Sequence, residues 1–316
     1  MSREFIRRFT TSGYFIEQYA VDQPADVDTY IEEGKATIAV VLPAGFGRKM
    51  LARETVQVQA VLDGTDANTA NVLLTYANQI IAQYSQNALG NVNLLKRAAG
   101  TGQVIPEPRV WFNPDLLSSN FMVPGVVALV LMIITMTLTS LGIVKEKELG
   151  TLEQLMVTPI KPYELILGKL LPFILIGYLD VVIVLAVARY WFEVPLVGSL
   201  PLLFLLSGMF ILTTLGLGLF ISTIAKSQQQ AMLIAQFFFF MPFMYLSGFA
   251  FPISNMPAVI QYITYIIPLR YFLEIVRAIF LKGSTLHELW PQAVALFLIG
   301  VATLTLSVLR FHKKLD

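Results

Sequence analysis

The chain has 316 residues, of which 56% are hydrophobic and 14% are charged, and its mean hydropathy of +0.67 is too high for a soluble protein. The net charge is +1 and no basic stripe accompanies it, so the sequence gives no support to nucleic-acid binding. The absence of cysteine excludes disulfides and thiolate metal sites, and two histidines, His287 and His312, are too few to suggest a metal centre.

The charged residues are unevenly distributed along the chain. The first 115 residues carry 22 of the 43 charges, whereas long uncharged stretches fill the remainder. We therefore expect a polar N-terminal domain at 1–115 and a transmembrane domain at 116–316.

Helices and strands are predicted to alternate in the N-terminal domain. The expected elements are helices at 2–11, 24–33 and about 70–88 and strands at 36–43, 55–62 and 104–112. This alternation indicates a small α/β domain. The glycine-rich stretch GFGRK at 45–49 does not fit the P-loop pattern GxxxxGK[ST], which is absent from the whole chain, so we interpret it as a polar turn.

Five membrane spans are predicted in the rest of the chain, because each apolar run is long enough to cross a hydrocarbon core about 30 Å thick. The expected spans are 116–144, 165–191, a helix within 194–225, 229–251 and 289–309. The uncharged stretch 227–269 is too long for a single span, so we expect an interfacial or re-entrant piece at about 256–282.

The orientation follows from the basic residues in the short loops, which favour the cytoplasmic side. Eight lie near one set of span ends and four near the other, so we expect residues 145–162 and the C-terminus in the cytoplasm. The N-terminal domain would then lie outside the cytoplasm. Such a domain needs a preceding span to cross the membrane, and we therefore expect one ahead of Met1.

A charged, amphipathic segment separates the first two spans. Thr151 and Gln154 have the spacing of a capping box, which predicts a short helix that begins after Gly150 and stops before Pro159. Its apolar face can rest on lipid headgroups or on a protein surface, and periodicity alone does not distinguish the two.

This segment, GTLEQLMVTPIKPYELILGKLLP, resembles the cytoplasmic loop of bacterial ABC exporter permeases of the type-2 membrane class. The stretches YWFEVPLVGS, YLSGFAFPISNMP and ITYIIPLRYFLEIVRAIFLKG also resemble that family, and so does the N-terminal domain. The resemblance implies an efflux permease without enzymatic activity that works as a homo- or heterodimer in the bacterial inner membrane. ATP and Mg²⁺ would bind to a separate ATPase subunit, and a periplasmic adaptor would be a further partner.

The resemblance also implies that the short helix is a coupling helix seated on the ATPase. The residues expected to take part in this coupling are Glu146, Glu148, Gly150, Thr151, Leu152, Glu153, Gln154, Leu155, Thr158 and Pro159.

A substrate path is the second site that the sequence suggests. Asp180 is an acidic residue inside a predicted span, which marks it as a functional candidate. Phe237, Phe240, Met241 and Met244 offer adaptable apolar surface for drug-like or lipid-like cargo.

Three other kinds of membrane protein compete with this interpretation. A secondary transporter would show internal repeats, and a membrane enzyme would show clustered catalytic side chains, and neither pattern is visible. A sensor or scaffold with an extracytoplasmic ligand-binding domain stays open as the alternative.

Overall fold

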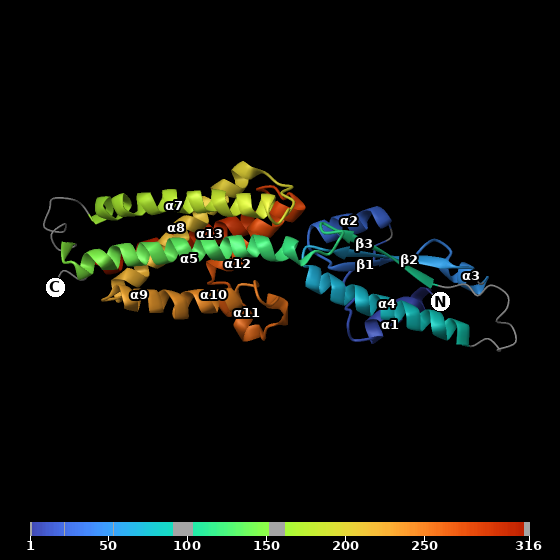
Figure 1. Cartoon of the computed structure of the whole chain (residues 1–316). Helices are drawn as coiled ribbons and strands as arrows, with labels where there is room; N and C mark the ends of the chain where they lie inside the picture. Colours follow the sequence, from blue (N-terminus) through green and yellow to red (C-terminus); the bar gives the residue numbers. More distant parts are fainter. Residues whose placement is uncertain (1, 22, 53, 91–103, 152–161, 313–316) are drawn as a thin grey trace. The chain divides into compact units, whose positions relative to one another are not determined.

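The computed structural model describes residues 2–21, 23–52, 54–90, 104–151 and 162–312 (Figure 1). Contacts within the chain divide it into two compact units, Met1–Phe121 and Met122–Asp316. Each unit is described by itself.

The first unit contains a three-stranded sheet and four helices. The helices are α1 (Ser2–Thr11), α2 (Pro24–Glu32), α3 (Phe46–Leu51) and α4 (Ala67–Gly90), and the strands are β1 (Ile38–Val41), β2 (Val56–Asp63) and β3 (Val104–Trp111). The predicted helices and strands are thus confirmed to within a few residues at each end. The extracytoplasmic placement of this unit stays a prediction.

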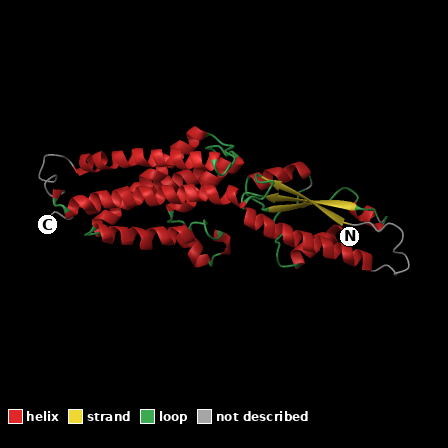
Figure 2. Ribbon diagram, in the orientation of Figure 1, coloured by secondary structure: helices red, strands yellow, loops and turns green. Residues whose placement is uncertain are grey.

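The strand order is β1-β2-β3, with β1 antiparallel and β3 parallel to β2. The sheet is drawn in yellow in Figure 2. In the register, Val58 lies opposite Pro106 and Ala60 lies opposite Pro108. β3 therefore contains two prolines, and proline occurs in sheets mainly on edge strands because it has no N–H to donate.

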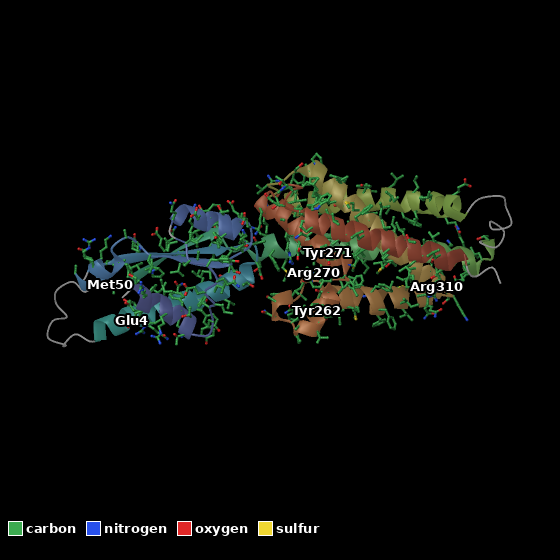
Figure 3. The ribbon with its side chains drawn as sticks, turned by 180° about the vertical axis from the view of Figure 1, so that it is seen from behind. Glu4, Met50, Tyr262, Arg270, Tyr271 and Arg310 are labelled. Atoms are coloured by element: carbon green, nitrogen blue, oxygen red, sulfur yellow. The ribbon has the colours of Figure 1, made fainter. Side chains whose placement is uncertain are left out.

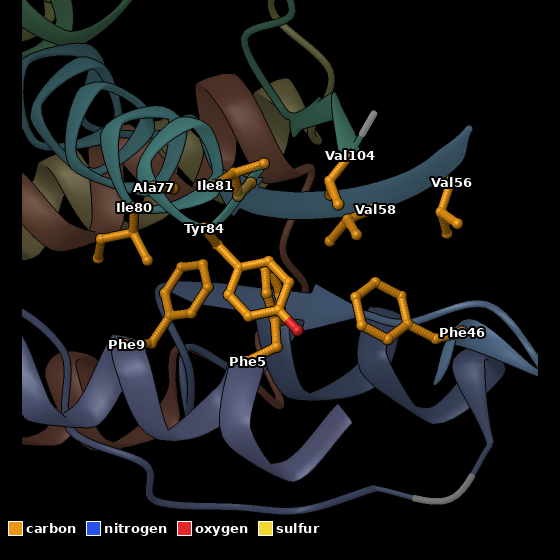
Figure 4. Packing of buried hydrophobic residues seen from close by; sticks show 10 residues of the cluster. All are labelled: Phe5, Phe9, Phe46, Val56, Val58, Ala77, Ile80, Ile81, Tyr84 and Val104. Atoms are coloured by element: carbon orange, nitrogen blue, oxygen red, sulfur yellow. The ribbon is translucent and has the colours of Figure 1, made fainter. Parts of the chain in front are cut away.

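The core of the first unit lies between the sheet and helices α1, α3 and α4. Phe5 is fully buried, and its ring lies 4.9 Å from that of Tyr84 and 5.4 Å from those of Phe9 and Phe46 (Figure 4). Val58 on β2 completes the contact with the sheet. A smaller cluster around Ile31 and Val61 places α2 on the opposite face.

The predicted polar turn at 45–49 is instead the start of α3. Gly45 adopts a φ of 73°, which glycine tolerates without strain, and the helix follows immediately. Phe46 is only 2% exposed and packs against Phe5. The prediction of a turn considered only the glycines of this stretch. The packing of Phe46 against Phe5 explains why a helix forms here.

The described residues of the second unit form helices joined by loops, without a strand (Figure 2). Five helical segments are long and apolar enough to cross a membrane, as the sequence predicts. They are α5 (Ser118–Glu148), α7 (Pro162–Tyr190), α8 (Leu200–Ile224), the run formed by α9 (Gln228–Ile234), the π-helix η2 (Ala235–Phe240) and α10 (Met241–Leu246), and α13 (Trp290–His312).

Between α10 and α13 the chain forms several short helices. These are η3 (Ile253–Asn255), α11 (Ala258–Thr264), α12 (Pro268–Arg277) and the π-helix η4 (Ala278–Lys282). α12 packs against α8 and α13, and the ring of Phe272 stacks on that of Phe210 at 4.0 Å. Since Phe210 lies ten residues into α8, or about 15 Å from its start, this segment enters the bundle as a re-entrant piece would.

Small residues let the helices of the second unit approach closely. A Cβ atom on Gly216 of α8 would lie 2.9 Å from the hydroxyl of Thr303 on α13, and one on Gly300 of α13 would lie 2.7 Å from that of Thr213 on α8. The hydroxyl of Ser307 donates to the Gly216 carbonyl at 2.9 Å. Such contacts are typical of helix association in membranes.

Candidate functional site

The candidate site lies where α5 ends, which we call the Glu148 end of the bundle. The helix runs through Glu148, and Gly150 then takes a left-handed φ of 71°. Backbone N–H groups of Leu149 and Gly150 donate to the carbonyls of Lys145 and Lys147, which closes the last turn. The left-handed glycine is the usual way to end a helix and turn the chain away from its axis.

Two consecutive side chains of this turn reach the junction between α8 and α9. The ammonium of Lys147 donates to the Ala225 carbonyl at 2.8 Å. The Glu148 carboxylate accepts from the backbone N–H of Gln228 at 2.8 Å and from its side-chain amide at 2.5 Å. A carboxylate at the first residue of α9 also matches the positive end of the helix dipole.

The preceding residue connects the same turn to a third helix. Glu146 forms an ion pair with Lys169 of α7, whose side chain is only 18% exposed. The hydroxyl of Thr151 donates to the Glu146 carbonyl at 3.1 Å, which adds a side-chain hydrogen bond to the last turn of α5. Because successive helical residues differ by about 100° in direction, Glu146, Lys147 and Glu148 point to different neighbours.

We call these contacts the polar brace: Glu146–Lys169, Lys147–Ala225 and Glu148–Gln228. The brace links the last turn of α5 to α7, to the end of α8 and to the start of α9. Residues 150–151 thus directly follow a turn that contacts several of the helices long enough to cross a membrane.

The structure brings four of the predicted coupling residues together: Glu146, Glu148, Gly150 and Thr151. The other six, Leu152, Glu153, Gln154, Leu155, Thr158 and Pro159, lie outside the described residues. Three residues of the site were not predicted from the sequence: Lys147, Lys169 and Gln228. One available signal was the polar stretch KSQQQ at 226–230, which interrupts two apolar runs.

The residues of the predicted substrate path lie apart. Asp180 is half-buried on α7, and one carboxylate oxygen is buried without a hydrogen-bond partner among the described residues. The phenylalanine run lies on η2, and Figure 1 shows α7 and the α9–α10 run on different sides of α5. Phe237 and Met241 are 54% and 41% exposed, while Phe240 and Met244 are half-buried.

A different phenylalanine of the run lines a cavity. Phe239 contributes to an apolar cavity of about 190 Å³ that α8 and α13 also line. The π-helix rotates the residues that follow it relative to a regular α-helix, and the periodicity of the sequence does not reveal this rotation. π-helical segments are often found at functional sites. No cluster of three potential metal ligands occurs among the described residues.

Comparison with known proteins gives consistent matches over most of the chain. The family model described as ABC-2 family transporter protein matches residues 1–309. A probable multidrug ABC transporter permease of Escherichia coli, YbhS, is 35% identical over 319 residues, which cover 99% of this chain and 82% of the relative. A second such permease, YbhR, is 33% identical over 313 residues, with 99% and 83% coverage. The E. coli inner membrane transport permease YhhJ is 30% identical over 302 residues, with 91% and 76% coverage.

Proposed function

The chain belongs to the ABC-2 family of transporter proteins as a permease component, and from this membership we propose that it is the membrane subunit of an ATP-driven exporter. It is a multi-span membrane protein, and its relatives are transport permeases rather than enzymes. ATP and Mg²⁺ would be bound by a separate ATPase subunit, which docks on residues 150–160 at the cytoplasmic face.

The polar brace is the observation that carries this proposal. A coupling element must pass a displacement of the ATPase to the spanning helices, and this requires contacts that resist separation. The three brace contacts join the last turn of α5 to α7, α8 and α9 directly before the predicted docking segment. Glu146 and Glu148 thus support the segment from within the chain, which leaves Glu153 as the acidic contact to the partner.

The remaining parts of the proposal concern assembly and cargo. We place the chain in the bacterial inner membrane with its C-terminus in the cytoplasm, as half of a homo- or heterodimer. The proposed cargo is drug-like or lipid-like, because relatives are named as probable multidrug permeases and the exposed faces of η2 and α10 are apolar. The unit at Met1–Phe121 would meet a periplasmic adaptor.

Co-purification tests the docking of the ATPase. The chain is co-expressed with its candidate ATPase, and capture is compared for wild type, Glu153→Arg and Glu193→Arg. Glu193 is exposed beyond the other end of α7, so its replacement makes the same charge change away from the Glu148 end. We expect Glu153→Arg to lose the ATPase and Glu193→Arg to retain it, with equal membrane insertion of both. A wild-type chain that captures no ATPase would remove the energy source and contradict the proposal.

A further inference from the structure

The cavity beside Phe239 has no role in the coupling described above. Among the described residues, five line it: Leu217 and Phe220 on α8, Phe239 on η2, and Thr303 and Leu306 on α13. The only hydroxyl among them, that of Thr303, already donates to the Gly300 carbonyl at 3.0 Å. The described lining therefore offers no free donor, and an apolar cavity of this kind does not hold ordered water.

Measured along the helices, the cavity lies about the thickness of one membrane leaflet from the start of α9 and from the end of α13. Phe239 follows the start of α9 by eleven residues, or about 16 Å, and Thr303 precedes Arg310 by seven, or about 10 Å. Half of a hydrocarbon core about 30 Å thick is about 15 Å. Leu306, which lines the cavity, is 58% exposed, so this part of the lining faces outward from the bundle. Under the predicted orientation this leaflet is the cytoplasmic one.

The guanidinium of Arg310 lies next to the cavity. The guanidinium of Arg310 lies over the ring of the lining residue Phe220, 5.8 Å from its centroid, and Arg310 follows Leu306 by one helical turn. Figure 3 shows Arg310 near the end of α13. Within the described part of the chain no carboxylate lies within 4 Å of this guanidinium.

We propose that this cavity binds an acyl chain of an anionic phospholipid of the adjacent leaflet, with the phosphate held by Arg310. The apolar lining accepts the chain, the outward-facing side at Leu306 admits it from the bilayer, and the guanidinium provides the donors that phosphate requires. Basic residues next to clefts between helices are a recognised way of binding anionic headgroups. A soluble anion would not use the apolar lining, and an apolar drug would not use the cation.

Lipid binding to the purified full chain tests this proposal. The detergent-solubilised protein is titrated with phosphatidylglycerol or phosphatidylcholine of the same chain length, and bound lipid is counted by native mass spectrometry. We expect a preference for phosphatidylglycerol of about fivefold, which is the contribution of one basic residue near a membrane surface. Arg310→Gln is expected to abolish the preference, whereas Lys226→Gln, which changes an exposed cation of the α8–α9 junction, is expected to keep it.

A second pair of variants separates this site from general charge effects. Leu306→Glu places a carboxylate one turn before Arg310, where it pairs with the guanidinium and repels phosphate. Leu309→Glu makes the same change at a residue of similar exposure that does not line the cavity. We expect only Leu306→Glu to lose the headgroup preference. Equal binding of both lipids to wild type, or an unchanged preference in Arg310→Gln, would overturn the proposal.

Discussion

The packing inside each of the two units relies on different kinds of side chain. In Met1–Phe121 the core is built from large rings, and Phe5 alone contacts three other aromatic residues. In Met122–Asp316 the tightest contacts are made by glycines and hydroxyls, such as Gly218 against Met136 and Thr135 against Thr214. Ring packing thus characterises the core of the first unit, whereas the second unit combines buried rings, such as Phe210 on Phe272, with close backbone approach.

The difference reflects the solvent of each unit. In water, burial of an apolar ring is favourable in proportion to the area removed, so bulky cores are stabilising. In a bilayer the lipid is as apolar as leucine, and helix association depends on van der Waals contact and interhelical hydrogen bonds instead. We therefore expect the stability of the first unit to depend most on a buried ring, and that of the second unit on a glycine at a close helix contact.

The largest effect is expected in the ring cluster of the first unit. Phe5→Ala should destabilise this unit by about 3–5 kcal/mol, because a fully buried ring is replaced by a cavity. Limited proteolysis of the full chain in detergent should then show faster cleavage within α1 and α4. Ile16→Ala is the control, since that side chain is 85% exposed. Equal protection of both variants would refute the role of the ring cluster.

The second effect tests close backbone approach in the bundle. A Cβ atom on Gly218 would lie 2.6 Å from the Met136 carbonyl oxygen, which cannot move without shifting α5. Gly218→Ala should therefore lower stability by about 1–3 kcal/mol, the usual cost of overpacking. The matched control is Gly168→Ala on α7, where no described residue outside the helix's own backbone comes within 4 Å of the added Cβ. Thermal unfolding in detergent compares the two, and equal midpoints would contradict the comparison.

The third prediction concerns the polar brace, which consists of hydrogen bonds and an ion pair rather than ring or glycine contacts. Gln228→Glu places a carboxylate against the exposed carboxylate of Glu148, so like-charge repulsion should replace the two hydrogen bonds of this contact, with only a small effect on stability. In proteoliposomes with the ATPase, transport per ATP should fall. The exchanged pair Glu148→Gln with Gln228→Glu restores an amide opposite a carboxylate and should recover coupling. If the double variant behaves like Gln228→Glu, the contact does not transmit motion.

The smallest effect is expected for a hydrogen bond between two hydroxyls inside the bundle. The hydroxyls of Thr135 and Thr214 are 2.7 Å apart, and both residues are buried. A double-mutant cycle with Thr135→Val and Thr214→Val should give a coupling energy of about 0.6 kcal/mol, because such bonds in membranes are individually weak. Unfolding midpoints of the four proteins provide the measurement. A coupling energy of several kcal/mol would mean that hydroxyls, not close approach, dominate this unit.

Most of the secondary structure could be predicted from the sequence because it depends on local patterns. The spans follow from uncharged runs of sufficient length, and the boundary of α2 follows from Pro24 at its start. The family was also recognisable, because its motifs are continuous stretches of sequence.

What could not be predicted depends on contacts between distant residues. Glu148 and Gln228 are 80 residues apart, and no local pattern indicates that they meet. Phe239 lines the cavity because η2 is a π-helix. The sequence pattern instead suggested Phe237 and Phe240 as the functional residues of this run. The helix α3 escaped prediction because Phe46 is anchored by a ring on α1.

The two prolines of β3 have a consequence for how molecules of this protein behave beside one another. Pro106 and Pro108 remove two N–H groups from a strand at one end of the described sheet. Another extended chain cannot form a regular ladder along that side, because two successive donors are missing. Protection against edge-to-edge aggregation is thus built into the strand that leads to the first span, where neighbouring copies would be concentrated in the plane of the membrane.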